Sequence, residues 1–209
     1  MTTPIYAPIV SHYESCLEAH GDSHRGVDWP NLHDAERRYQ VMLELAPRSH
    51  QVTTLLDFGC GLGHLYDHMV RMGRRDLAYR GLDVSPSFVE AARTRRPKLR
   101  FDVADVLSPD AKWEGADWIV MNGVFTEKRE LPHDAMFAYM LDVLDKVWAK
   151  TRRGLAFNVM SKVVDWERDD LFHVSMDSLA AALVPRVGRT VTFRHDYGLY
   201  ELTVYLRRR

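Results

Sequence analysis

The sequence of 209 residues predicts an α/β fold, in which a doubly wound, mostly parallel seven-stranded sheet carries helices on both faces and ends in an antiparallel hairpin. Two observations predict this fold. Short apolar runs typical of buried strands alternate with amphipathic segments of helical periodicity. Residues 190–206 (TVTFRHDYGLYELTVYL) have instead the pattern of two strands joined by a tight turn. The chain length suits a single domain.

Five strands are expected before the hairpin. The segment DWIVMNGVF is almost continuously apolar, as a central parallel strand buried on both faces should be. The five expected strands lie within residues 52–58, 79–85, 99–106, 117–125 and 154–160.

The intervening helices are expected from caps and periodicity. Over residues 31–46 apolar side chains recur on one face, Asp28 or Asn31 can cap the start, and Pro47 ends the helix. Ser85 followed by a proline is a typical helix start. Further helices are expected at residues 65–73, 133–151 and 176–183.

Composition excludes several classes of partner. The 28 basic residues nearly cancel the 29 acidic ones, so a net charge of -1 gives no electrostatic reason to expect a nucleic-acid partner. No apolar run approaches the roughly 18 residues that span a bilayer, and the amino terminus lacks the pattern of a signal peptide. The two cysteines form neither a disulfide framework nor a metal quartet. We expect a cytoplasmic monomer or homodimer without nucleic-acid, membrane or metal partners.

The most informative stretch is the glycine-rich loop LLDFGCGLGHL, residues 55–65. It places Asp57 ahead of Gly59, Gly61 and Gly63, directly after the first strand. In open α/β sheets, ligands bind beyond the carboxyl ends of the strands. The dinucleotide fingerprint requires a third glycine where this chain has His64, which disfavours a nicotinamide cofactor. An acid ahead of the glycines would repel a pyrophosphate but attract an ammonium group. S-adenosylmethionine has an ammonium, a sulfonium and no phosphate, and it fits this loop.

From residue 52 onward, the chain resembles the class I S-adenosylmethionine-dependent methyltransferases. The matching motifs, in family order, are LLDFGCGLGHL, YRGLDVSPSFVEAAR, FDVADV, DWIVMNGVF and GLAFNVM. The terminal hairpin matches the sixth and seventh strands of that fold. Five motifs in order at the usual intervals make the resemblance specific.

The resemblance implies a role for each motif residue. Gly59, Gly61 and Gly63 would pass under the methionine and ribose portion of the cofactor, and Asp57 would hold its amino group. Asp83 would accept hydrogen bonds from both ribose hydroxyls. The adenine ring would be contacted by Val84, Asp105 and Val106. Asn122 would lie beside the transferable methyl group.

The amino-terminal segment is the part that departs most from a bare cofactor fold. Residues 1–50 are expected to form a helical or lid segment ahead of the cofactor-binding domain, residues 51–209. The stretch from Tyr13 to Trp29 is rich in polar, aromatic and turn residues, and it is predicted to close over the cofactor. Tyr13, Trp29 or Arg38 is expected to touch the cofactor, an arginine being suited to its carboxylate.

The acceptor side is less legible. His133, His173 and His195 are the candidate general bases near the rim of the sheet. The segment MNGVFTE lacks the two prolines of enzymes that methylate amino groups of nucleic-acid bases. We therefore expect in-line methyl transfer to an oxygen or nitrogen of a small molecule or a sugar-bearing (glycan-type) metabolite. The alternatives are a cofactor-binding module without catalysis and an NAD(P)-dependent oxidoreductase.

Overall fold

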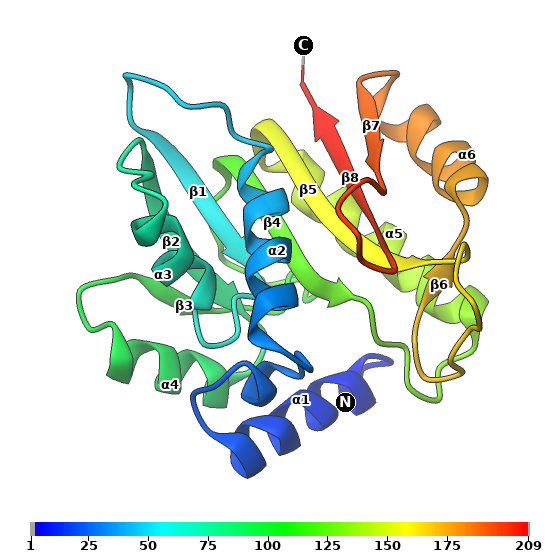
Figure 1. The fold of residues 1–209 in the computed structure, drawn as a ribbon, viewed down its shortest axis with the longest axis horizontal. Coiled ribbons are helices and arrows are strands. Elements are labelled where there is room, and N and C mark those ends of the chain that lie inside the picture. Colours follow the sequence, from blue (N-terminus) through cyan, green and yellow to red (C-terminus); the bar gives the residue numbers. More distant parts are fainter. Residues whose placement is uncertain (1–2, 209) are drawn as a thin grey trace.

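In the computed structural model, which describes residues 3–208, one eight-stranded sheet runs through the molecule in the order β3-β2-β1-β4-β5-β8-β7 (Figure 1). The strands on this path are β1 (Thr53–Phe58), β2 (Leu77–Asp83), β3 (Phe101–Val103), β4 (Ala116–Phe125), β5 (Thr151–Ser161), β7 (Val191–Arg194) and β8 (Glu201–Arg207). The eighth strand, the two-residue β6 (His173–Val174), pairs with β5 off the path. Strands β1 to β5 pair in parallel, whereas β8 pairs antiparallel with β5 and β7. The predicted sheet, with its antiparallel end, is confirmed.

Helices cover both faces of the sheet, as predicted. On one face, α2 (Leu32–Leu43) and α3 (His64–Arg71) pack their apolar sides onto β1 and β4. On the other, α5 (His133–Ala149) and α6 (Met176–Val187) bury theirs against β4, β5 and β8. A smaller cluster of side chains joins α4 (Pro86–Arg95) to β3.

The local signals read from the sequence act as expected at the helix starts. The Ser85 side chain accepts a hydrogen bond from the Phe88 backbone N–H at 3.3 Å, and Asn31 accepts one from Asp34 at 2.8 Å. These caps satisfy backbone donors that have no partner in the first helical turn. No helix within residues 3–208 is long and apolar enough to cross a bilayer.

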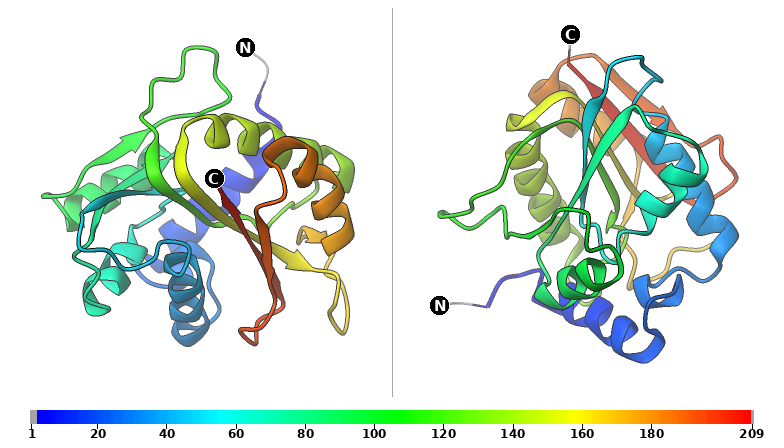
Figure 2. Two further views of the ribbon diagram at one scale, coloured as in Figure 1. Left: turned by 90° about the horizontal axis from the view of Figure 1, so that it is seen from above. Right: turned by 90° about the vertical axis from the view of Figure 1, so that its left-hand side faces the viewer.

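The amino-terminal segment contains an element that the sequence pattern did not predict. Helix α1 (Ala7–His20) is followed by a short 3-10 helix, η1 (Arg25–Val27). Two views show α1 lying across the end of the sheet at which the parallel strands finish (Figures 1 and 2). The segment therefore lies over the edge where ligands bind in this class of fold.

Candidate active site

The loop after β1 requires glycine at positions 59 and 61. Gly59 and Gly61 have φ angles of 67° and 49°, which side-chain-bearing residues rarely adopt. A Cβ atom on Gly59 would lie 2.6 Å from Val124 Cγ2, and one on Gly61 would lie 3.1 Å from Val27 Cγ1. The loop thus lies tightly between β4 and the amino-terminal segment, and it exposes backbone to a cavity beside it.

Asp83, at the end of β2, holds this loop in place. Its carboxylate accepts hydrogen bonds from the Gly61 N–H at 2.8 Å and from the Ser85 N–H at 3.0 Å. Burial raises the pKa of Asp83, while the hydrogen bonds from the backbone of Ser85 and Gly61 oppose that shift. Each carboxylate oxygen keeps a free lone pair, so Asp83 can still accept further hydrogen bonds from a ligand in the cavity.

Asp57 is the second carboxylate at this edge. It is buried, and it accepts a hydrogen bond from the Tyr79 hydroxyl at 2.8 Å. Burial raises the pKa of Asp57 to about 7, and the nearby charge of Asp83 adds to the effect. Because two buried carboxylates lie close together, a positively charged ligand group beside Asp57 would be attracted.

The cavity beside the loop, called the first cavity below, gathers most of the predicted cofactor residues. Its walls include Tyr13, Trp29, Asp57, Gly59, Gly61, Asp83, Val84 and Asn122. Gly63, Asp105, Val106 and Arg38 do not line it. Asp105 accepts a hydrogen bond from the Leu107 N–H at 2.9 Å, and Val106 is buried in the core. Gly63 begins α3 with a φ of 74°, packed against Phe101.

Helix α1 and its first flanking residue supply a wall of this cavity, of which only Tyr13 was predicted from the sequence. Tyr6, Ile9, Val10 and Tyr13 all line the cavity, at the i, i+3, i+4 and i+7 spacing of one helical face. The same spacing is visible in the sequence YAPIVSHY, and it was the available signal. The polar, turn-rich stretch that follows concealed it.

A series of buried polar groups connects Trp29, another residue of the cavity wall, to the sheet. The Gly123 N–H donates to Asn158 Oδ1 at 2.8 Å, and Asn158 Nδ2 donates to Glu201 Oε2 at 2.6 Å. Arg38 then donates to Glu201 Oε1 at 2.6 Å, and its guanidinium lies 4.2 Å from the centre of the Trp29 ring. This series fixes Trp29 above Gly123, where a Cβ would lie only 2.9 Å from the indole. Glu201 was not predicted as a site residue.

A second and larger cavity, of about 800 Å³, lies on the other side of Tyr13 and Trp29. These two residues line both cavities. Five carboxylates and three arginines line the second cavity, so its walls are not a basic surface. Arg38 also lines this wall, and its buried Nη1 has no hydrogen-bond partner within residues 3–208. The Tyr13 and Trp29 side chains therefore separate two compartments that meet at the end of β4.

The three histidines predicted as bases do not gather in one cavity. His173 lines the second cavity, but its Nδ1 contacts the Ser161 carbonyl at 2.7 Å and its Nε2 accepts from the Arg168 N–H at 3.2 Å. Both ring nitrogens are thus engaged. His133 contacts the His173 carbonyl oxygen at 3.0 Å, and neither His133 nor His195 lines either of these two cavities.

Glu127 is the titratable group that sequence reasoning overlooked here. It lies just beyond β4, is 6% exposed, and lines the second cavity. Burial raises the pKa of Glu127, and the charge of Asp28 raises it further. No local sequence signal marks this residue, because its neighbours include residues far along the chain, such as Asp28 and Leu171.

The residues of the first cavity fit a ligand with an ammonium group, a ribose and a flat ring. Asp57 and Asp83 offer carboxylate oxygens, and Val84 and Phe88 offer apolar surface. Asn122 Oδ1 is buried without a hydrogen-bond partner among the described residues. A bound ligand can supply the hydrogen-bond partner that a buried polar atom of this kind lacks.

Comparisons with known proteins agree with this geometry. The methyltransferase-domain family matches residues 55–146. Rv1506c of Mycobacterium tuberculosis (strain ATCC 25618 / H37Rv), described as a methyltransferase, is 34% identical over 157 residues, covering 73% of this chain and 91% of the relative.

Solved structures show the same fold. Magnesium protoporphyrin IX methyltransferase (ChlM) from Synechocystis PCC 6803, with bound SAM, superposes with a TM-score of 0.68 at 13% identity, covering 100% of this chain and 99% of the other. The small RNA methyltransferase HEN1 superposes with a TM-score of 0.57 at 15% identity, covering 84% of this chain and 25% of the other.

A Gly-rich loop, two carboxylates at the ends of neighbouring strands and this strand order define a class I methyltransferase fold. The chain belongs to the class I S-adenosylmethionine-dependent methyltransferases. S-adenosylmethionine is accordingly its cofactor.

Proposed function

We propose that this methyltransferase binds a small molecule or a sugar-bearing metabolite in the second cavity and methylates an oxygen or nitrogen of it. The observation that carries the proposal is the aromatic mouth of that cavity. Trp166 and Tyr200 are 74% and 60% exposed, and both belong to its wall. Large aromatic side chains held in water favour a site that a ring-shaped ligand covers.

Charge in the second cavity argues against a polyanionic acceptor. Carboxylates outnumber arginines in its wall, whereas nucleic-acid binding depends on basic side chains that neutralise phosphates. The Tyr200 hydroxyl donates a hydrogen bond to the Asp165 carboxylate at 3.3 Å. Polar groups of this kind suit the hydroxyls of a small acceptor.

The cofactor supplies an electrophilic methyl group on its sulfonium. The Gly59–Gly61 loop and Asp83 would hold the ribose end, and Asp57 would hold the amino group. Tyr13 and Trp29, placed between the cavities, would align the acceptor atom with the methyl group, which is the main requirement of an in-line displacement.

Glu127 is the group we assign to proton removal from a hydroxyl acceptor. It lies in the wall of the second cavity and its raised pKa brings it nearer to neutral pH, where a general base is most effective. A neutral amine acceptor needs this base less.

Within residues 1–50, the stretch from Tyr13 to Trp29 would act as the lid of this site, because α2 is packed into the core. Several side-chain contacts attach this stretch to the cofactor-binding part. Three of them are Glu14 with Ser85 at 2.5 Å, Asp22 with His64 at 2.6 Å, and Tyr13 with the Gly123 carbonyl at 3.2 Å. All three are polar contacts near the rim, which a segment can break and remake. Closure would exclude water from the reacting atoms.

The test is a screen for release of S-adenosylhomocysteine with three acceptor sets: small hydroxylated or aminated metabolites, glycans, and structured RNA. We expect turnover with one of the first two. Trp166→Ala should raise the KM for that acceptor at least about tenfold, whereas Val163→Ala, in the same exposed loop but outside the cavity wall, should leave KM unchanged. Turnover with RNA alone would overturn the proposed acceptor class.

A further inference from the structure

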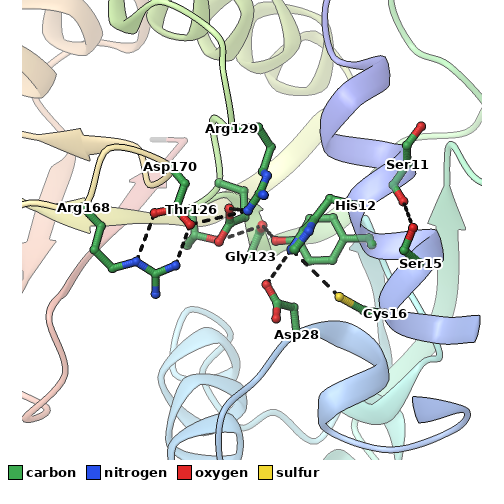
Figure 3. Close-up of polar contacts among 12 residues, drawn as sticks. Ser11, His12, Ser15, Cys16, Asp28, Gly123, Thr126, Arg129, Arg168 and Asp170 are labelled. Carbon is green, nitrogen blue, oxygen red and sulfur yellow. Dashed lines mark hydrogen bonds and ion pairs between the residues drawn. The ribbon is translucent and has the colours of Figure 1, made fainter. Parts of the chain in front are cut away.

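Three side chains of the amino-terminal segment bring metal-ligating atoms together. His12, Cys16 and Asp28 present a nitrogen, a sulfur and an oxygen that all lie within 4.8 Å of one another (Figure 3). His12 and Cys16 are one turn apart on α1, so they share a helix face. Asp28 follows η1 and lies opposite that face.

The backbone at Asp28 is suited to this placement. Asp28 has a φ of 58° and a ψ of 29°, and its N–H bonds the Arg25 carbonyl oxygen at 3.0 Å. This left-handed conformation ends η1 and directs the carboxylate toward His12. The Asp28 side chain is 39% exposed and lines the second cavity, so the cluster is accessible from there.

The contacts of the His12 ring distinguish a metal site from a nucleophilic triad. His12 Nε2 lies 2.8 Å from Asp28 Oδ2 and 3.9 Å from Cys16 Sγ. In a Cys-His-Asp triad the sulfur and the carboxylate contact different ring nitrogens, so that one orients the ring while the other moves the proton. Here both contacts fall on the same nitrogen.

We propose that His12, Cys16 and Asp28 bind a divalent ion of the zinc type, with a fourth coordination position open toward the second cavity. Nitrogen, thiolate sulfur and carboxylate oxygen are the ligands that zinc prefers, and three protein ligands with an open position are typical of its catalytic sites. On binding, the Cys16 thiol releases its proton to solvent. The single proton of the neutral His12 ring moves from Nε2 to Nδ1 by exchange with solvent, so that the Nε2 lone pair is free for the ion between His12 and Asp28.

Neighbouring charges support a cation at this point. Glu127, which is 6% exposed, lines the second cavity together with Asp28. Arg129 is paired with both Glu127 and Asp170, at 3.3 and 3.4 Å, so its charge is compensated (Figure 3). A divalent ion beside Asp28 would lie near two carboxylates.

The ion would have a role in the proposed reaction. A hydroxyl bound to zinc ionises near neutral pH, and Tyr13, next to His12 in the chain, lines both cavities. An acceptor hydroxyl on the open position would therefore be activated beside the methyl group. This role rests on the proposed function, but binding of the ion does not.

Cobalt is the probe for the site, because its bond to a thiolate gives a charge-transfer absorption band. The full chain, freed of metal by a chelator and kept reduced, should bind one equivalent of Co²⁺ with such a band, and Zn²⁺ should displace it. Cys16→Ser should abolish the band. His12→Gln and Asp28→Asn should weaken Co²⁺ binding by roughly tenfold or more, the asparagine being tolerated in the left-handed conformation.

Two matched variants control for the other thiol and for a simple His-Asp pair. Cys60→Ala removes the remaining free cysteine, and His33→Gln removes an exposed histidine that lies 3.4 Å from Asp34 without a nearby sulfur. Both should keep the band. No band in the wild type, or a band that survives Cys16→Ser, would show a hydrogen-bonded cluster only and overturn the proposal. The readout needs neither acceptor nor methyl transfer, so its failure would leave the proposed function standing.

Discussion

The two cavities are built in different ways, although Tyr13 and Trp29 belong to both. The loop wall of the first cavity comes from residues that follow β1 and β2 within a few positions, such as Gly59, Asp83 and Val84. The second cavity is assembled from residues far apart in the chain, such as Arg38 and Glu201, which meet 163 positions apart. The first is determined by local backbone geometry and the second by tertiary packing.

This difference teaches where sequence patterns inform about function. A glycine pattern after a strand indicates a conformation that the backbone itself requires. This requirement is the same whichever acceptor the enzyme methylates. A cavity wall made from six helices and strands and the loops between them carries no such pattern. We therefore expect substitutions in the loop to lower cofactor affinity strongly, and substitutions in the second cavity to change cofactor affinity little.

The largest effect is expected from Gly59→Ala. The alanine would have to adopt a φ of 67°, and its Cβ would lie 2.6 Å from Val124 Cγ2. The loop must therefore shift away from β4. Binding of S-adenosylhomocysteine, measured by calorimetry, should fall by about a hundredfold or more, equal to about 3 kcal/mol. Gly73→Ala is the matched control, because Gly73 has a φ of 65° but nothing within 4 Å of the added carbon. Equal losses in both variants would show backbone strain alone at work.

Asp83→Asn should have the next largest effect. The substitution removes the charge that strengthens hydrogen bonds from the ribose hydroxyls, each worth roughly 1.5–3 kcal/mol, and it weakens the contact with the Gly61 N–H. Cofactor affinity should fall at least about tenfold. Asp105→Asn should change affinity much less, since Asp105 does not line the first cavity. The reverse order would assign the adenine or ribose contact to Asp105 instead.

Much of the fold could be read from the sequence because its signals are local. The helix cap at Ser85, the apolar β4 and the terminal hairpin each depend on neighbours in the chain. Helix α1 was missed although Tyr6, Ile9 and Tyr13 have helical spacing, because polar residues and glycines beyond position 20 suggested a loop.

The acceptor half could be read only in part. Trp29 and Tyr13 were predicted as site residues from their place in the amino-terminal segment, and they do line the first cavity. Glu127 and Glu201 could not be identified, because a buried carboxylate depends on partners supplied by distant elements such as Arg38. The locked ring of His173 was equally invisible, since its partner Arg168 binds through the backbone.

A smaller effect, about tenfold, is expected from pH. Because the pKa of Asp57 is raised to about 7, the carboxylate ionises as the pH rises through neutrality, and only the ionised form attracts an ammonium group. Affinity for S-adenosylhomocysteine should therefore rise about tenfold between about pH 6 and about pH 8, with release of a proton. Asp57→Asn should flatten this dependence. A wild-type affinity that stays constant over this range would contradict contact between Asp57 and the amino group.

The same group predicts how the unliganded fold responds to pH. The pKa of Asp57 is near 3.8 when unfolded and about 7 when folded. Between these values the folded state binds more protons than the unfolded state, so the free energy of unfolding should decrease as the pH rises from about 4 to about 7. Urea unfolding of the wild type and Asp57→Asn, compared at both ends of this window, isolates the contribution of Asp57 from other carboxylates.

The smallest effect is expected from Tyr13→Phe, which tests the wall shared by the two cavities. The Tyr13 hydroxyl donates to the Gly123 carbonyl at 3.2 Å, and that carbonyl also accepts from Thr126 at 3.1 Å, so it keeps a partner when Tyr13 is changed. The loss should be one neutral hydrogen bond, about 0.5–1.5 kcal/mol. If the stretch from Tyr13 to Trp29 opens as a lid, the open population should rise about two- to tenfold, and tryptic cleavage after the exposed Arg25 should accelerate by the same factor. Saturating S-adenosylhomocysteine should slow that cleavage in both proteins. Tyr200→Phe loses a hydroxyl contact to Asp165 in the wall of the second cavity and should leave cleavage at Arg25 unchanged. If the two variants accelerate cleavage equally, or the ligand gives no protection, the segment is a fixed part of the fold and not a lid.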